Sequence, residues 1–134
     1  MIALSAQNLS VQSSDKIRLN NLSLDVESGS RVAIIGPNGA GKSTALQALL
    51  QLIPATFQSL QYFNQNIQTL SRKKLAKLVA YVPQTHPNLT ISVWDWCVYA
   101  RFPYQKFGFF LTQEEHDIIN VILEKTALTQ YKNT

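Results

Sequence analysis

An α/β fold is predicted by three adjacent features of the sequence. The apolar run Val32-Ala33-Ile34-Ile35 is typical of a buried strand. It leads directly into Gly36-Pro37-Asn38-Gly39-Ala40-Gly41-Lys42-Ser43, which has the pattern G-x-x-x-x-G-K-S. Apolar residues at helical spacing then continue to Ile53, and Pro54 ends the run. A strand, a glycine-rich loop and a helix in this order are the arrangement in which main-chain amides surround a phosphate.

Each part of this loop has its own expected role in holding a nucleotide. The glycines at its two ends let the main chain turn tightly and approach a phosphate. Lys42 would reach the terminal phosphates, the Ser43 hydroxyl would coordinate Mg²⁺, and Thr44 is placed for a further phosphate contact. An ordinary turn before a surface helix can show the same pattern. The flanking strand and helix favour the phosphate-binding interpretation.

The composition is that of one folded soluble domain. The chain has 134 residues, of which 46% are hydrophobic and 15% are charged. Its single Cys97 excludes a disulfide within the chain, fits a reducing, cytoplasmic compartment and, with two isolated histidines, predicts no metal site. The N-terminus lacks the pattern of a secretion signal, and the longest uncharged stretch, 43–71, is interrupted by Pro54 and six glutamines. Any link to a membrane is therefore expected to be through a partner.

The net charge of +4 comes mostly from scattered basic residues. The one basic cluster, Arg72-Lys73-Lys74 with Lys77, is typical of a solvated helix face. Because no nucleic-acid-binding motif accompanies it, no nucleic-acid partner is predicted.

The first half of the chain is expected to open with β structure. Two alternating stretches, Leu9-Ser10-Val11 and Leu22-Ser23-Leu24-Asp25-Val26, predict an antiparallel β layer. After the phosphate-loop strand and helix, a weaker strand is expected over 58–63. Ser71 is then expected to cap a helix that runs to about Val79, and Ala80-Tyr81-Val82 predicts a short apolar strand that Pro83 closes.

Helices are expected to dominate the second half. Residues 92–101 have helical length and spacing, and an aromatic-rich connection follows to Phe110. The segment Thr112-Gln113-Glu114-Glu115 predicts a capping box at the start of the last helix. Its apolar residues recur at helical spacing and are expected to face the core: Ile118, Ile119, Ile122 and Leu123.

The segment Tyr81-Val82-Pro83-Gln84, in which Gln84 follows Lys42 by 42 residues, resembles the Q-loop of ATP-binding cassette (ABC) ATPases. The resemblance covers essentially the whole chain. It implies a P-loop NTPase fold of ABC type that is incomplete here: an N-terminal antiparallel β layer, a partial parallel core sheet with the phosphate-loop helix, and the start of a helical subdomain. The β layer and core would occupy residues 1 to about 84, and the helical subdomain would begin at about 85 and run to 134.

The same resemblance implies a function. In ABC ATPases the Q-loop glutamine contacts Mg²⁺ and the attacking water, so Gln84 inherits a catalytic role in positioning both. ATP and Mg²⁺ would be the cofactors, with Ser43 and Gln84 at the metal. The implied partners are a transmembrane permease, contacted through the Q-loop and the aromatic region 86–110, and a second nucleotide-binding subunit in a head-to-tail dimer. The implied location is the cytoplasmic face of the plasma (inner) membrane, as a peripheral subunit.

A further segment resembles one subgroup of ABC ATPases. Ile91-Ser92-Val93 followed by Ala100-Arg101-Phe102-Pro103-Tyr104 is similar to a segment in the ATPases of importers for ferric siderophores, haem and cobalamin. This implies import of a metal chelate. Ala100 stands where those ATPases usually have glycine.

Two departures from the family pattern bear on activity. No Phe, Tyr, Trp or His precedes Phe57, so the aromatic residue that normally stacks on adenine is missing from the aligned position, about Ser13. Adenine recognition is therefore expected to be weak or to depend on apolar contacts from Val11 or Ile17. The signature L-S-G-G-Q, the strand ending in Asp-Glu and the switch histidine are also absent, and both His86 and His116 are predicted to be non-catalytic. The chain alone is therefore expected to be inactive as an ATPase.

Two other interpretations stay open. One is a compact P-loop kinase or GTPase in which Asp95 ends a strand and organises the metal, although no N-K-x-D guanine motif occurs. The other is a non-catalytic, truncated module whose aromatic surface binds a partner.

Overall fold

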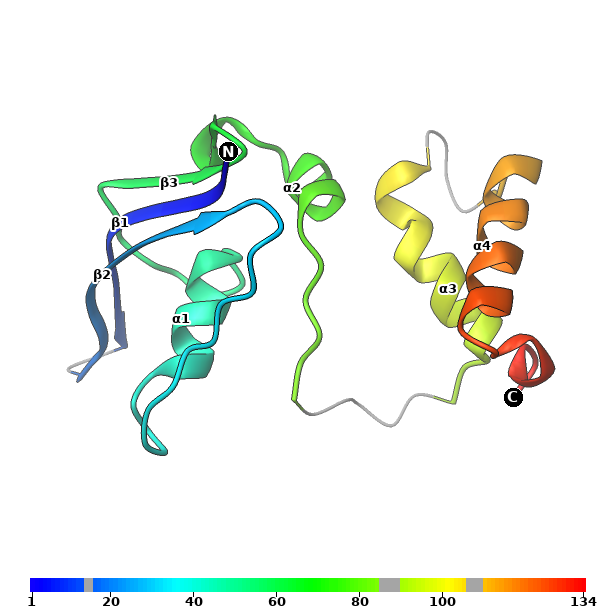
Figure 1. The fold of residues 1–134 in the computed structure, drawn as a ribbon, viewed down its shortest axis with the longest axis horizontal. Helices are drawn as coiled ribbons and strands as arrows, with labels where there is room; N and C mark the ends of the chain where they lie inside the picture. The colour runs from blue at the N-terminus through cyan, green and yellow to red at the C-terminus, as the bar shows by residue number, and fades with distance from the viewer. Residues whose placement is uncertain (14–15, 85–89, 106–109) are drawn as a thin grey trace. The chain divides into compact units, whose positions relative to one another are not determined.

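The computed structural model describes residues 1–13, 16–84, 90–105 and 110–134 (Figure 1). The chain divides into two compact units, an N-terminal unit, Met1–Tyr81, and a C-terminal unit, Val82–Thr134. None of the described helices has the length and apolar character needed to cross a bilayer.

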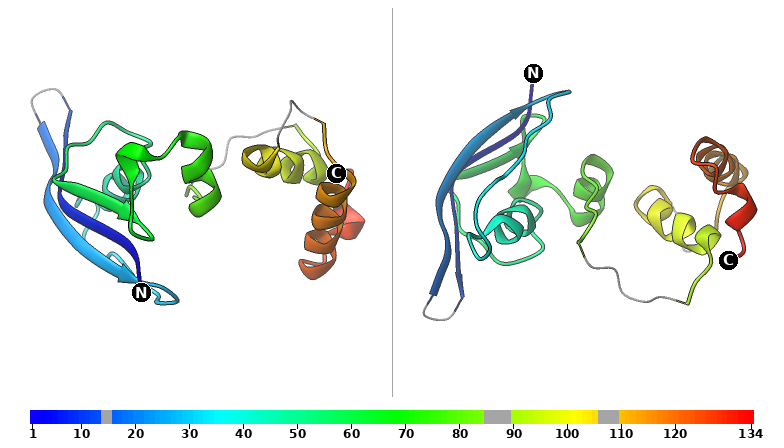
Figure 2. Two further views of the ribbon diagram at one scale, coloured as in Figure 1. Left: turned by 90° about the horizontal axis from the view of Figure 1, so that it is seen from above. Right: turned by 60° about the horizontal axis from the view of Figure 1, so that its bottom comes forward.

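The N-terminal unit is built on a four-stranded antiparallel sheet in the order β2-β1-β3-β4. Strands β1 (Ile2–Ser13) and β2 (Lys16–Glu27) form a long hairpin, β3 (Ser59–Tyr62) pairs with the other side of β1, and the short β4 (Gln65–Asn66) pairs with β3. The predicted antiparallel layer and the predicted strand near 58–63 are both confirmed. The hairpin curves, and helix α1 (Lys42–Leu49) lies on its concave side (Figure 2).

A β-bulge at Asn8 decides which side chains of β1 enter the core. Before the bulge Ala6 is buried, and after it Leu9 and Val11 are buried, so the inward face changes from even to odd positions. The pairing with β2 shifts register between Ala6 and Leu9, and Asn8 has a φ of 54°, in the left-handed region that asparagine tolerates better than most residues. The bulge therefore keeps both halves of a 12-residue strand in contact with one core.

That core lies between the sheet and α1. Its buried members come from β1, α1, β3 and the 3₁₀ turn η1 (Ile67–Thr69): Ala6, Leu9, Val11, Ala48, Leu49, Leu60, Tyr62 and Ile67. The Tyr62 hydroxyl donates a hydrogen bond of 2.9 Å to the Leu49 carbonyl, which joins β3 to the end of α1. The helix ends there, before the predicted Ile53, because Gln51 adopts a φ of 55° that no α-helix continues through.

Burial raises the pKa of Tyr62 from the ordinary 10.0 to about 12, which predicts a pH dependence of stability. The folded state favours the neutral phenol, so the ionisation of Tyr62 should leave the free energy of unfolding unchanged below pH 10 and should lower it as the pH rises through 10 toward 12. Urea unfolding of the parent and Tyr62→Phe between pH 7 and 12 measures this. The variant should be about 1 kcal/mol less stable at pH 7 because the Leu49 carbonyl loses its donor. The difference should shrink above pH 10, and a constant difference would contradict the assignment.

Two predicted strands do not form. Residues 32–35 have no strand partner among the described residues, and Val32 and Ile35 are 62% and 91% exposed. Residues 80–82 are also irregular, and Val82 is 80% exposed. Apolar strands of a parallel sheet depend on neighbours on both sides, and the described strands pair only in antiparallel fashion. The partial parallel core sheet expected from the sequence is therefore not formed among the described residues.

The short helix α2 (Arg72–Leu78) matches its prediction. The Ser71 hydroxyl accepts a hydrogen bond of 3.2 Å from the Lys74 amide and so caps the helix. All four residues of its basic cluster are exposed, as expected for a solvated helix face: Arg72, Lys73, Lys74 and Lys77.

The C-terminal unit contains α3 (Val93–Arg101), the 3₁₀ turn η2 (Phe102–Tyr104), α4 (Gln113–Lys125) and the 3₁₀ turn η3 (Thr129–Tyr131). Both bonds of the predicted capping box are present, between Thr112 and Glu115. The apolar stripe of α4 is only partly in the core. Ile119 and Leu123 are fully buried, whereas Ile122 is 43% exposed and its predicted burial is wrong.

Candidate phosphate-binding site

The glycine-rich segment connects the irregular residues 32–35 to the first turn of α1. Gly39 and Gly41 have φ angles of 82° and 89°, values that side-chain-bearing residues rarely adopt. Gly41 is also the N-cap of α1, and a Cβ atom there would lie 2.7 Å from the Arg18 carbonyl oxygen of β2. These two positions therefore need glycine for the main chain to turn into α1 and to approach β2.

Lys42 folds back over the loop. Its ammonium donates hydrogen bonds to the carbonyl oxygens of Gly36 at 2.8 Å and Pro37 at 2.7 Å. Both carbonyls are in exposed residues, so phosphate oxygens would compete with them for the same ammonium. The Lys42 ammonium, which is predicted to contact phosphates, thus already lies against the loop.

The first turn of α1 provides a favourable environment for an anion. The amides that open a helix have no intrahelical acceptor, and the helix dipole adds partial positive charge. The first turn contains no acidic residue, and Gly41 has no side chain that could cap it. The residues present therefore fit a phosphate group, with amides, the Lys42 ammonium and the Ser43 and Thr44 hydroxyls as the available donors.

The residues present also bear on the predicted Mg²⁺ site. Within the described part of the chain, no group of three His, Cys, Asp or Glu side chains could hold a metal ion. A magnesium ion bound through one hydroxyl and substrate phosphates does not require such a cage. Ser43 is exposed in the first turn of α1, which fits this mode of binding.

Gln84 lies in the C-terminal unit and is exposed. The loop belongs to the N-terminal unit, so the joint action of Gln84 and Ser43 on one metal stays a prediction. His86 lies outside the described residues.

The interpretation of Asp95 as a carboxylate at the end of a strand is wrong. It lies in the first turn of α3, where its amide donates to the Ser92 hydroxyl at 3.1 Å and its carboxylate accepts from that hydroxyl at 2.6 Å. Asp95 therefore lies in the first turn of a helix that Ser92 caps, and the compact kinase or GTPase interpretation loses the strand-end carboxylate on which it depended.

The two apolar residues expected to replace the adenine-stacking aromatic differ in accessibility. Val11 is only 4% exposed, whereas Ile17 is 66% exposed. Both line a cavity of about 330 Å³ beside the segment 54–56, together with Leu19. Ile17 is thus the more accessible of the two to a base.

An aromatic surface covers α3 and η2 in the C-terminal unit. Its members are between 41% and 57% exposed: Trp96, Tyr99, Phe102 and Tyr104. Phe110, which precedes α4, is 87% exposed. The Arg101 guanidinium lies 4.0 Å from the centroid of the Tyr104 ring. Trp94 is instead half-buried, with the His116 ring at 5.2 Å and the Lys132 ammonium at 3.9 Å from the ring centroid. Within the predicted aromatic region 86–110, Phe102 and Tyr104 are thus exposed, and residues 86–89 and 106–109 lie outside the described residues.

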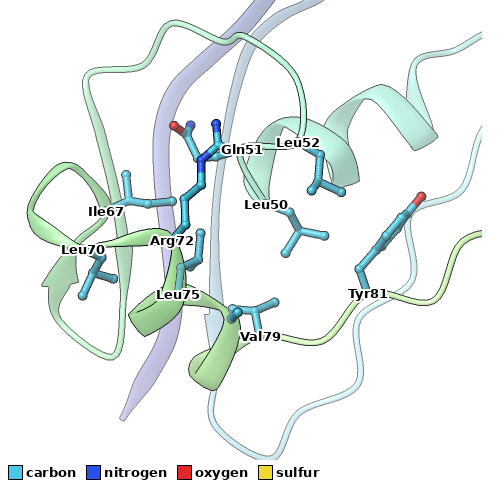
Figure 3. A pocket seen from close by; sticks show the side chains of 10 residues that line it. Leu50, Gln51, Leu52, Ile67, Leu70, Arg72, Leu75, Val79 and Tyr81 are labelled. Atoms are coloured by element: carbon cyan, nitrogen blue, oxygen red, sulfur yellow. The ribbon is translucent and has the colours of Figure 1, made fainter. Parts of the chain in front are cut away.

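Sequence reasoning missed an apolar cavity between the end of α1 and α2 (Figure 3). It measures about 330 Å³, and Arg72 and Gln51 are the polar residues at its lining. The apolar lining comes from both elements and the segments after them: Leu50, Leu52, Ile67, Leu70, Leu75, Ala76, Val79 and Tyr81. The sequence signal for this cavity was the pair Leu50 and Leu52, which follow the end of α1 and need an apolar surface to cover them.

Comparisons with known proteins give consistent results. The family model described as ABC transporter matches residues 19–134. The chain is 30% identical over 132 residues to the iron(3+)-hydroxamate import ATP-binding protein FhuC of Bacillus subtilis, covering 98% of this chain and 49% of that protein. It is 41% identical over 91 residues to the hemin import ATP-binding protein HmuV of Photobacterium profundum, covering 68% of this chain and 32% of that protein.

Solved structures agree on the fold. An ATP-binding subunit of an ABC transporter superposes with a TM-score of 0.78 at 21% identity, covering 98% of this chain and 53% of that one. CbiO1 of Clostridium perfringens, part of the transporter complex cbiONQ, gives a TM-score of 0.69 at 22% identity, covering 99% and 53%. The α/β fold class predicted from the sequence is confirmed. The chain spans about half the length of the FhuC protein and of both solved chains.

Proposed function

Because the chain belongs to the ABC transporter family, we propose that its glycine-rich loop binds ATP with Mg²⁺ and that the chain is an ATP-binding part of an importer. The observation that carries this proposal is the direction of Lys42, whose ammonium lies over the carbonyls of Gly36 and Pro37. An exposed helix start without acidic residues adjoins it. Titration of Mg·ATP into the parent chain and a Lys42→Ala variant is the test.

The proposed roles follow the chemistry of each group. The main-chain N–H groups of Gly36, Asn38, Gly39, Ala40 and Gly41 through Thr44 would surround the phosphates, and Lys42 would neutralise the terminal ones. Pro37 has no N–H and would contribute to the site by holding the turn of the loop. Ser43 would hold Mg²⁺, which supplies neutralisation of phosphate charge when it is bound. Gln84 would share that metal and orient the attacking water. The Thr44 hydroxyl would add a further phosphate contact.

The division of the chain into two units supports a proposal for its domain boundaries. We assign the β layer and phosphate loop to the P-loop core, residues 1 to about 84, and the residues from about 85 to the start of a helical subdomain. The chain passes from the N-terminal unit to the C-terminal unit between Tyr81 and Val82, close to this proposed boundary.

The transport role is inferred from the names of the relatives. These are ATP-binding proteins for the import of iron(3+)-hydroxamate, petrobactin and hemin. Import of a metal chelate such as a ferric siderophore, haem or cobalamin is the corresponding proposal for this chain. It would act as a peripheral subunit at the cytoplasmic face of the inner membrane, beside a permease and a second nucleotide-binding subunit.

The aromatic surface of α3 and η2 is the proposed contact with the permease. Exposed aromatic side chains with an adjacent arginine are typical of hot spots that receive an amphipathic helix. Phe102 and Tyr104 are both exposed and lie beside the half-buried Arg101.

A photoreactive side chain at position 102 should therefore crosslink to a membrane-embedded protein. Benzoylphenylalanine in place of Phe102 keeps the aromatic character, and the same residue in place of Asp117, exposed on α4, is the matched control. After irradiation of cells that produce the chain, mass spectrometry of the crosslinked product should identify a multispanning permease for position 102 only. Equal products from the two positions would argue against this docking surface.

A further inference from the structure

Strand β2 runs directly beside the phosphate-binding loop. The Arg18 carbonyl oxygen lies 2.7 Å from the position that a Cβ atom on Gly41 would take, and the Leu19 side chain lies 4.0 Å from it. Only the absence of a side chain at Gly41 permits this approach. Arg18 is therefore next to the residue that opens α1, where the loop would hold phosphates.

The side chain of Arg18 is exposed. In the described part of the chain, no hydrogen bond or ion pair engages its guanidinium. It is thus available to a ligand at the loop.

The elements that form and immediately flank the loop in the sequence contribute no aromatic side chain. None of residues 1–56, which include β1, β2, the loop and α1, is Phe, Tyr, Trp or His. A base held beside the loop would meet no aromatic ring from these elements. Arg18 and Arg31 are the two guanidinium groups in this stretch, and it is Arg18 whose main chain contacts Gly41.

We propose that Arg18 contacts the base of a bound nucleotide by stacking its guanidinium plane on the ring. This inference rests on the proposed nucleotide site and adds a recognition residue to it. A guanidinium is planar and weakly hydrated, and it stacks on aromatic faces in a way that an ammonium does not. Every base offers such a face, so the contact supports ATP and GTP alike.

The experiment compares three ligands, ATP, GTP and inorganic tripolyphosphate, by titration calorimetry with Mg²⁺ present. Arg18→Ala should weaken ATP and GTP binding about 10-fold and leave tripolyphosphate binding within about 2-fold of the parent. Arg18→Lys keeps the charge without the plane and should restore little of the lost affinity. Arg72→Ala, an exposed arginine on α2, is the matched control and should bind all three ligands like the parent.

Each other outcome overturns the inference. An equal loss for tripolyphosphate, or full rescue by Arg18→Lys, would mean that Arg18 acts as a charge on the phosphates. Unchanged affinities in Arg18→Ala would place the side chain outside the site. If the parent binds none of the three ligands, the proposed nucleotide site fails and this inference fails with it. Circular dichroism spectra of the variants distinguish lost contacts from lost folding.

Discussion

Lys42→Ala should weaken binding of Mg·ATP and ADP by about 10- to 100-fold, the effect expected from losing one charged hydrogen-bonding group at a phosphate. The ammonium now contacts two carbonyls of exposed residues, Gly36 and Pro37, so its removal leaves no buried group without a partner. The free energy of unfolding should therefore change little. Titration calorimetry measures the affinity, and denaturant unfolding checks the fold.

Lys74→Ala is the matched control for this variant, because Lys74 is an exposed lysine on α2 of the same unit. It should bind nucleotide like the parent. Identical affinities of the parent and Lys42→Ala would refute the phosphate-binding role of the loop. The parent should also bind ATP and GTP with similar affinity, since no aromatic residue that could stack on adenine precedes Phe57.

The second large effect is the absence of turnover. We expect phosphate release by the purified chain to be several orders of magnitude slower than about 1 s⁻¹, the low end of ordinary enzyme rates. Rapid hydrolysis requires a positioned water and groups that stabilise the developing charge. The carboxylates of Asp95 and Glu115 are already engaged in helix capping, and Gln84 can orient water but supplies no negative charge.

Phosphate release is measured on the parent and on Lys42→Ala, so that contaminating ATPases contribute equally to both. The two rates should be indistinguishable. A Lys42-dependent rate near 1 s⁻¹ would instead show that another carboxylate, such as the exposed Glu114, acts with the loop. The compact P-loop enzyme would then replace the transporter subunit as the better interpretation.

Elements defined by local chemistry could be predicted from the sequence. The caps at Ser71 and Thr112 each depend on a side chain and an amide three residues apart, and both form as expected. The start of α1 at Lys42 follows from the glycine-rich loop in the same way. Such interactions need no distant partner, so their sequence pattern is sufficient.

Elements that depend on distant partners could not be predicted as well. The run 32–35 has the composition of a buried strand, but composition carries no information on whether neighbouring strands are present to pair with it. The bulge at Asn8 and the bond from Tyr62 to Leu49 are likewise set by tertiary packing. In the site, the loop residues were identified from the motif. The contact of Arg18 with Gly41 joins residues 23 positions apart and leaves no pattern in the sequence.

The exposed run 32–35 also bears on how long a molecule of this chain survives in a cell. Its residues include Ile35, which is 91% exposed, and they present unpaired main-chain groups in a sequence with high β propensity. Chaperones and proteases select molecules that expose apolar chain, and chain association begins at such segments. We therefore expect the cellular lifetime of the protein to increase when another polypeptide surface covers this run.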